Sequence, residues 1–449
     1  MSLRTGIVAA AVGALLMVDV GAAAAAPDLR GPHVDEPVSW QSKVDSTRQV
    51  RSADARYRAQ ATATGTSKRV HTVQVVVATP KGMTKSQVAR YLRTSDVDRL
   101  VDGVARYWRE QSANRITFVR TGAVERIDTG DGACRTQKQI IKQVKRGGAK
   151  HYGKGWYTSS TRGPDRRAHL VVLYPYRSGD YPGGGRFGST CDGTVGLGSI
   201  PSSTGRNSPG GWTFVLAGGP NGASVGSRWS HEQYRRGIAT LAHEVGHNMG
   251  LEHSGVGWCD GVRDGGFRSG SCGAAEGLDP LDLMGADFAA RGVPALSGAQ
   301  RHRLGVLPAS ERQWVGKSGG NRTVYLTARD RDTKRPTLVR VRDPRSGETY
   351  SIELRRKDPD VSYPYARIPY RASRDYTVRY GVTVSRVAGS RSTWAYPGEH
   401  LIVPMGRSSA RRSSMWEGQT FTTRTGGVKI TVKNVSAGQR TAKLRITFP

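Results

Sequence analysis

The chain has 449 residues and a formal net charge of +32, from 68 Lys and Arg against 36 Asp and Glu. A chain of this length is too long to fold around one ordinary hydrophobic core, so we expect two or three domains. A hydrophobic share of 37% and 57 glycines favour a soluble, loop-rich secreted protein over a membrane protein.

The positive charge has two interpretations. It could attract anionic partners such as cell-wall polymers, acidic proteins or nucleic acid. It could also reflect a solvated surface rich in Arg. The Arg residues are spread over the whole length and no nucleic-acid-binding motif is present, so we favour the second interpretation and expect no specific nucleic-acid partner.

Residues 1–26 have the pattern of a secretory signal peptide: Arg4, an apolar run over 6–18, and small residues over 21–26. The apolar run is too short to cross a bilayer stably, and no later segment is a predicted transmembrane helix. We therefore predict a secreted, extracellular protein. Residues 27–68 are polar with little apolar periodicity, which indicates a pro-segment or a disordered arm.

From Val70 onward, strand and helix patterns alternate. We predict helices at residues 96–111 and 136–144, and strands at residues 70–79, 116–119, 168–174, 195–200 and 213–216. The nearly continuous apolar run 168–174 indicates a central strand, whereas 195–200, between Gly-rich loops, indicates an edge strand. The pattern predicts an α/β (α+β) domain over residues 69–310.

A further helix is predicted to begin at Ser230, which forms a capping box with Gln233. Its apolar residues repeat at helical spacing and should face the sheet: Ile238, Leu241, Ala242, Val245 and Met249. Gly246 costs about 1 kcal/mol relative to Ala inside a helix, so we expect it to make room for a close neighbour.

This helix carries the pattern H-E-x-x-H-x-x-G-x-x-H. His243 and His247 are four residues apart, so both can face one metal ion. Gly250 can adopt a left-handed conformation, which ends the helix and returns His253 as a third nitrogen ligand. Three protein ligands leave the fourth position of a catalytic Zn²⁺ open for water, and Glu244 can act on that water as general base.

Past the motif, residues 254–280 are predicted to form a loop. Four cysteines in an exported chain favour two disulfides, and three pairings of Cys134, Cys191, Cys259 and Cys272 exist. We favour Cys259 with Cys272 and Cys134 with Cys191. Residues 260–265 could hold a structural Ca²⁺, although no complete calcium-loop signature supports it.

Met284 lies in a short turn, and a helix capped by Ser297 and Gln300 follows and ends at Gly305. Residues 311–449 are predicted to be all β and sandwich-like. The strands that we expect there are 322–328, 338–341, 349–354, 381–387, 428–432 and 444–448.

The pattern from His243 to His253, followed by Met284 in a turn, resembles the metzincin clan of zinc endopeptidases. The sequences of residues 278–285 and 304–307 are most similar to those of the gametolysin-type secreted peptidases. The resemblance implies a mixed sheet with an active-site helix, and a Met-turn beneath the zinc. Two features depart from other metzincin families: Ser254 follows the third His in place of Asp, and Ala286 stands where some members have Tyr.

These patterns together predict a secreted zinc endopeptidase that could bind an extended peptide along the edge strand at 195–200, with residues 286–293 shaping specificity. Two alternatives stay open: a surface- or wall-binding protein with a vestigial metal site, and a zinc hydrolase of cell-wall amides. His71 and His169 lie in predicted strands and are interpreted as core or surface residues. His231 opens the zinc helix and His302 lies on the later helix, and neither has a ligand-like partner.

Overall fold

The structure is a computed structural model that describes residues 69–80, 83–120, 123–130, 167–175, 196–199, 210–217, 229–259, 264–265, 272–275, 277, 279, 281–285, 293–316, 320–329, 335–356, 366–370, 374–378, 381–388, 398–403 and 414–449. The predictions for the signal peptide, for residues 27–68, for the helix at 136–144 and for Cys134 and Cys191 lie outside these residues.

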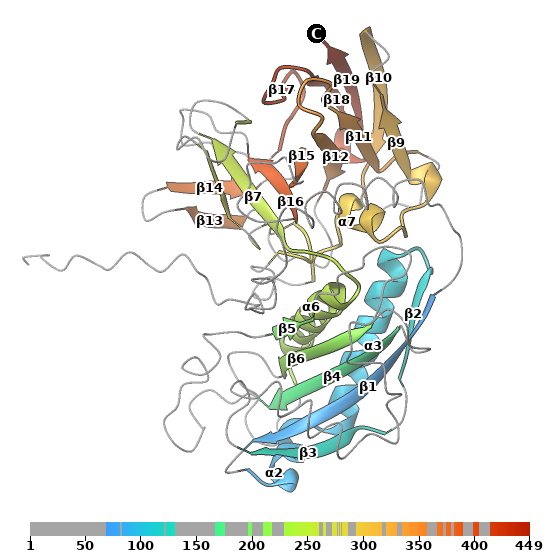
Figure 1. Cartoon of the computed structure of the whole chain (residues 1–449), viewed down its shortest axis with the longest axis vertical. Helices are drawn as coiled ribbons and strands as arrows, with labels where there is room; N and C mark the ends of the chain where they lie inside the picture. Colours follow the sequence, from blue (N-terminus) through green and yellow to red (C-terminus); the bar gives the residue numbers. More distant parts are fainter. Residues whose placement is uncertain are drawn as a thin grey trace, which may run out of the picture.

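A six-stranded sheet forms the first half of the molecule (Figure 1). Its strands are β1 (Arg69–Pro80), β2 (Ile116–Arg120), β3 (Glu125–Gly130), β4 (Ala168–Pro175), β5 (Gly196–Gly198) and β6 (Gly211–Ala217). The order is β2-β1-β4-β6-β5, with β3 also paired to β1. All pairings are parallel except that of the edge strand β5 with β6, so the predicted mixed sheet and its edge strand are confirmed.

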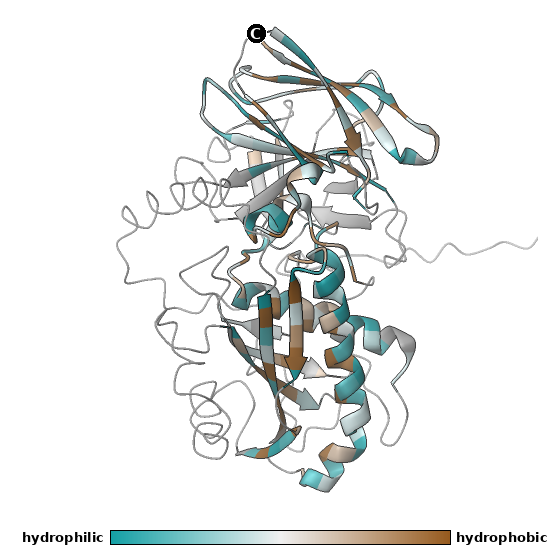
Figure 2. Cartoon of the chain, turned by 90° about the vertical axis from the view of Figure 1, so that its right-hand side faces the viewer, coloured by the Kyte–Doolittle hydropathy of each residue, from teal (hydrophilic) through white to brown (hydrophobic). Residues whose placement is uncertain are grey.

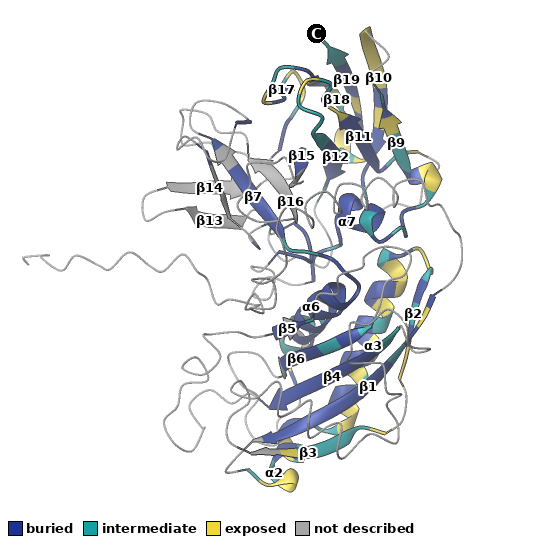
Figure 3. Cartoon of the chain, viewed as in Figure 1, coloured by how far each residue is buried: buried dark blue, intermediate teal, exposed yellow. Residues whose placement is uncertain are grey.

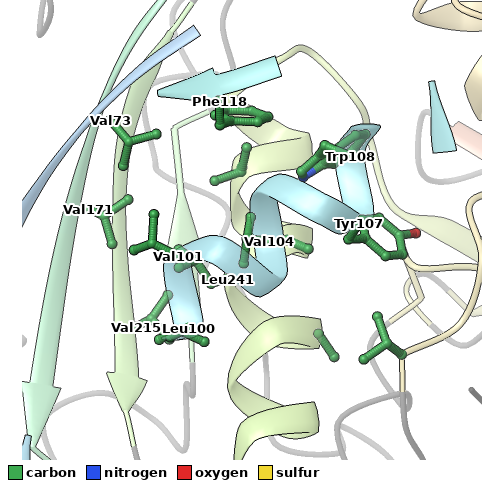
Figure 4. Packing of buried hydrophobic residues seen from close by; sticks show 14 of the residues in the cluster. Val73, Leu100, Val101, Val104, Tyr107, Trp108, Phe118, Val171, Val215 and Leu241 are labelled. Atoms are coloured by element: carbon green, nitrogen blue, oxygen red, sulfur yellow. The ribbon is translucent and has the colours of Figure 1, made fainter. Parts of the chain in front are cut away.

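The helices of this half are α2 (Lys85–Tyr91), α3 (Thr94–Gln111) and α6 (His231–Asn248). The apolar residues of α3 bury against the strands and against α6, which Figure 4 shows for Leu100, Val101, Val104 and Trp108. Figure 2 shows long hydrophobic stretches in the strands of the six-stranded sheet, and Figure 3 shows that α6 is largely buried. We call these elements, β1 to α6, the catalytic region.

Two further sheets form what we call the C-terminal β region. The seven-stranded sheet has the order β8-β7-β16-β15-β12-β11-β9, and the four-stranded sheet has the order β10-β19-β18-β17. Their strands are β7 (Ser254–Cys259), β8 (Cys272–Ala275), β9 (Arg312–Val315), β10 (Gly320–Thr327), β11 (Leu338–Arg342), β12 (Thr349–Arg355), β15 (Gly381–Ala388), β16 (Gly398–Val403), β17 (Thr420–Thr422), β18 (Lys429–Val435) and β19 (Thr441–Phe448).

Side chains from both sheets share one buried apolar cluster, as the sandwich-like prediction requires. A separate hairpin pairs β13 (Ala366–Tyr370) with β14 (Arg374–Val378). The helix α7 (Gly298–Arg303) begins after Ser297 as predicted, and 3₁₀ turns lie at η4 (Ala309–Glu311) and η5 (Ala437–Gln439). None of the helices in the described residues is long and apolar enough to cross a membrane.

The prediction of a loop over residues 254–280 was wrong. β7 begins at the residue after His253 and pairs in parallel with β16, while β8 pairs with β7. The run Ser254-Gly255-Val256-Gly257 has one large apolar side chain, so it carries no strand pattern of its own, and its partner β16 is far away in sequence. β7 and β8, which precede residue 310, thus belong to the same sheet as strands that follow residue 311. The domain boundary between residues 310 and 311 stays a prediction.

Candidate metal centre

Local signals fix both ends of α6. The Ser230 hydroxyl accepts a hydrogen bond from the backbone N–H of Gln233 (3.2 Å), and the Gln233 side chain accepts from the N–H of Ser230 (2.6 Å). At the other end, Gly250 has φ +85°, and the N–H of Leu251 reaches back to the carbonyl of Gly246 (3.0 Å). This is a Schellman cap, so the predicted helix stop at Gly250 is confirmed.

Three histidine nitrogens meet at the end of this helix. The Nε2 atom of His247 lies 3.1 Å from Nε2 of His243 and 3.3 Å from Nε2 of His253. These three residues form the metal-ligating cluster found among the described residues. Zn–N bonds of 2.0–2.1 Å in a tetrahedron place neighbouring nitrogens about 3.3 Å apart, so the cluster fits a zinc ion.

The hydrogen bonds of the other ring nitrogens set the tautomers. Nδ1 of His243 lies 2.7 Å from the carbonyl oxygen of Leu283, and Nδ1 of His247 lies 2.8 Å from that of Leu251. A carbonyl oxygen only accepts, so each Nδ1 must carry the proton. In the neutral rings the converging Nε2 atoms then present lone pairs, the state that a metal ion requires.

Met284 lies fully buried beneath this helix, as the Met-turn resemblance implies. A Cβ atom on Gly246 would lie 2.6 Å from its sulfur and 3.4 Å from the Trp108 ring. Gly246 therefore makes room for the Met284 side chain, which explains a helix glycine directly before a metal ligand.

The segment that carries His253 is held from both sides. The N–H of Ser254 donates to the carbonyl of Met284 (2.7 Å), and the Gln300 side chain donates to the Glu252 carbonyl and to the Ser254 hydroxyl (3.0 Å each). Ser254, the position where the sequence departs from some metzincin families, thus serves as a hydrogen-bond acceptor for α7. The sequence does not reveal this role of Gln300, because the contact joins positions 46 residues apart.

Glu244 is fully buried and faces the edge strand β5. A Cβ atom on Gly196 would overlap with Oε1 of Glu244, and one on Gly198 would lie 2.5 Å from its backbone carbonyl oxygen and 3.0 Å from Oε2. The two glycines let the strand lie directly on the proposed general base. The sequence predicted this strand at the sheet edge but did not reveal its contact with Glu244.

A buried polar chain joins the sheet to the last residue of α6. Asn248 donates through Nδ2 to the carbonyls of Ser199 and Trp212 (3.0 Å each), so its Oδ1 must accept from Nδ1 of His169 (3.2 Å). Nε2 of His169 then accepts from Nδ1 of His71 (2.8 Å). Burial is the main cause that lowers the pKa of His169 to about 4, which keeps its ring neutral.

His71 and His169 are therefore core residues, one of the two outcomes that the sequence left open. His302 is also buried, and burial with the charges of Arg340 and Arg312 lowers its pKa to about 3. His231 begins α6 at the end away from the metal ligands. Within the described residues, none of these histidines belongs to the metal-ligating cluster.

The predicted disulfide between Cys259 and Cys272 is present and joins β7 to β8. In the predicted calcium segment 260–265, only Asp264 and Gly265 belong to the described residues. The Asp264 carboxylate forms an ion pair with Arg386 (3.0 Å) and accepts from the Tyr350 hydroxyl (2.6 Å). These contacts give Asp264 a structural role, and the calcium hypothesis stays unsupported.

Residues 190–254 match the family model described as Metallo-peptidase family M12B Reprolysin-like. The matched segment contains β5, α6, the three histidines and Glu244. No curated protein matched the chain. The family match and the histidine cluster together identify a metallopeptidase site, in a segment that is similar to reprolysin-like peptidases.

Among solved structures, the chain is similar to wild-type OgpA from Akkermansia muciniphila at 10% identity and a TM-score of 0.29, over 75% of this chain and 96% of that chain. Catalytically inactive OgpA from the same organism, in complex with an O-glycopeptide (glycodrosocin) substrate, matches at 10% identity and a TM-score of 0.29, over 74% and 87%. TM-scores this low support no conclusion about fold or substrate.

Proposed function

We propose that the protein is a secreted zinc endopeptidase of the gametolysin-like type, with Glu244 as general base. The observation that carries the proposal is the set of converging Nε2 atoms of His243, His247 and His253, two of them with their Nδ1 protons held by backbone carbonyls. When bound there, zinc supplies a Lewis acid and lowers the pKa of its water to about 7.

In this proposal Glu244 transfers the proton and β5 binds the peptide. The Glu244 carboxylate accepts the proton of the attacking water and returns it to the leaving amine. An extended peptide could pair with β5, which within the described part of the sheet is bonded to β6 alone. Such pairing would bring a peptide bond alongside Glu244, because Gly196 and Gly198 lie against that residue.

Export is supported by the signal-peptide pattern of residues 1–26 and by the disulfide between Cys259 and Cys272. Disulfides form and persist in oxidising compartments and are rare in the cytosol. Peptides are the substrate class that the site favours, and the positive charge leaves attraction to anionic wall polymers as a secondary expectation.

Replacing Glu244 with Gln tests the mechanism. Gln keeps the shape of the side chain but cannot accept the proton, so we expect cleavage of a denatured protein to fall by about 10²- to 10⁴-fold, the typical contribution of a general base, while zinc content stays at one ion per chain. Unchanged activity in this variant would contradict the role of Glu244. Cleavage of cell-wall amides without cleavage of protein would favour the amidase alternative instead.

A further inference from the structure

The Met-turn contacts the metal site on one side and the C-terminal β region on the other. We define the Met-turn as residues 279 and 281–285. The carbonyl of Leu283 accepts from the metal ligand His243, and the turn keeps its shape through two side chains. Asp279 accepts from the N–H of Leu281 (2.9 Å), and Asp282 accepts from the N–H of Met284 (2.7 Å).

Arg355, the last residue of β12, reaches this turn from the seven-stranded sheet. Its Nη1 donates to the carbonyl of Leu281 (2.5 Å), and its Nη2 lies 3.7 Å from the Asp279 carboxylate. Its Nε bonds to Glu353 of the same strand (3.2 Å). The side chain is 5% exposed, so these contacts are made without water to replace them.

Glu353 extends the connection to α7. Its Oε1 accepts from the backbone N–H of Ala299 (3.2 Å), and a Cβ atom on Gly298 would lie 2.7 Å from the same oxygen. The N–H of Ser297, the cap of α7, in turn donates to Asp282 of the Met-turn (2.9 Å). Strand β12, the turn and α7 therefore form a closed set of buried hydrogen bonds beneath the metal site.

We infer that Arg355 is a positioning residue of the metal site: it fixes the Met-turn, and through the Leu283 carbonyl it fixes the ring of His243. The inference rests on the proposed zinc site. It also makes the C-terminal β region part of the catalytic machinery, rather than a binding module attached to it.

Without the Arg355 guanidinium, the Leu281 carbonyl would keep one more distant donor, Nη2 of Arg329 (3.4 Å). The carboxylates of Asp279 and Glu353 would each lose a buried donor, and loss of a partner by a buried polar group costs free energy. The turn can lower this cost by shifting toward water. Because Leu283 lies two residues from Leu281, such a shift moves the acceptor of His243. Loss of a partner that orients a metal ligand typically lowers metal affinity by about 10- to 100-fold.

Arg386 offers a matched control in the same sheet. It is fully buried on β15 and pairs with the carboxylates of Asp264 (3.0 Å) and Glu348 (3.4 Å). None of the bonds observed for it in the described residues reaches the Met-turn. Arg355→Met and Arg386→Met therefore remove the same charge from similar surroundings, but only the first removes a contact with the turn.

The experiment uses the full-length protein and compares R355M, R355K and R386M. The readouts are the zinc dissociation constant from competition with a chromogenic chelator, the Tm of the metal-free form, and kcat and KM on a peptide. We expect both Met variants to lower Tm, but only R355M to weaken zinc binding by about 10-fold, with a matching loss in kcat and little change in KM. R355K should fall between wild type and R355M, because one ammonium cannot reach all three acceptors.

A triple variant, R355M/D279N/E353Q, separates positioning from stability. The amide oxygens that it introduces at positions 279 and 353 would still accept from the N–H groups of Leu281 and Ala299, while the buried negative charges disappear. We expect its Tm to recover above that of R355M while zinc affinity stays reduced, and this variant carries the comparison if R355M does not fold. Equal zinc affinities in R355M and R386M, or full recovery of zinc affinity in the triple variant, would overturn the inference.

The proposed function can fail separately. A wild-type protein that binds zinc through the histidines but cleaves no peptide would contradict the peptidase proposal, and the zinc affinities of the variants would still decide the role of Arg355. A wild-type protein without zinc affinity would contradict both.

Discussion

The catalytic region and the C-terminal β region each have a buried apolar core, and they differ in the buried polar contacts that accompany it. In the catalytic region, a chain of hydrogen bonds joins His71, His169 and Asn248, which are neutral. The C-terminal β region buries ion pairs, those of Arg355 and Arg386 with their carboxylate partners. Close packing tolerates little added volume, whereas buried charges tolerate no loss of a partner. The two regions should therefore respond to opposite kinds of substitution.

Among substitutions outside the proposed ligands and general base, Gly196→Ala gives the largest expected effect on activity. The added methyl group overlaps with Oε1 of Glu244, so either β5 or the carboxylate must move. A displacement of about 1 Å at a catalytic group can cost about 100-fold in rate, and we expect a loss of this order in kcat/KM.

Gly427→Ala is the matched control in the other region, because its Cβ atom would likewise overlap with a carboxylate, that of Asp343. We expect it to lower Tm without lowering kcat/KM beyond the fraction unfolded. Equal losses of kcat/KM in the two variants would show that the effect of Gly196→Ala comes from general destabilisation and not from a steric constraint at the site.

The catalytic region and the Met-turn should also differ in how their stability depends on pH. His169 has a pKa of about 4 in the folded state against 6.5 in the unfolded chain, mainly because of burial. A depressed pKa contributes stability that is present above pH 6.5 and is lost as the pH falls toward 4, in total about 3 kcal/mol. Urea unfolding of His169→Gln between about pH 7 and 4 should show a shallower decline than wild type.

Asp279 in the Met-turn has the opposite sign. Burial raises its pKa above the usual value, against the opposing charge of Arg355. Its contribution to stability is therefore greatest below the unfolded pKa and is lost as the pH rises through the folded pKa. Asp279→Asn should remove this loss, so that stability relative to wild type improves toward neutral pH. Parallel pH profiles for the His169 and Asp279 variants would contradict the comparison.

Gly246→Ala has a smaller expected effect, on stability. Its methyl group would lie 2.6 Å from the Met284 sulfur, and crowding of a packed core costs about 1–3 kcal/mol. Met is flexible, so we expect the lower end of this range. Gly237→Ala on the same helix would meet a Leu100 methyl at 3.1 Å and gains helix propensity, so its unfolding free energy should change less. A larger loss of unfolding free energy in Gly237→Ala than in Gly246→Ala would show that the space beneath the metal ligands is not restricted.

The features that the sequence predicted depend on nearby residues, and the features that it did not reveal depend on contacts between distant ones. The zinc helix was readable because its cap, its apolar stripe and Gly250 act within a few residues, and the histidine spacing follows from helix geometry. The Arg355 contact joins positions 74 residues apart and leaves no local pattern. The strand β7 was missed for a similar reason, since its stability comes from β16 and the disulfide rather than from its own side chains.

Gly196 and Gly198 show a third limit. In the sequence they belong to the run 195–200, which we predicted as an edge strand between Gly-rich loops, and nothing in that run indicates why glycine stands at these two positions. Glycine is needed at both positions because a Cβ atom there would come too close to Glu244, and only the folded structure reveals this contact. The sequence thus singled out the three histidines and the proposed base, and the structure revealed the residues that contact them.

The proposed zinc site is best tested by X-ray absorption at the zinc edge of the purified protein, together with its zinc content. We expect one zinc ion per chain, bound by three imidazole nitrogens at about 2.0–2.1 Å and by one oxygen, and loss of this shell when His247 is replaced by Ala. A shell that contains sulfur, or a zinc signal that survives in the His247→Ala protein, would contradict it.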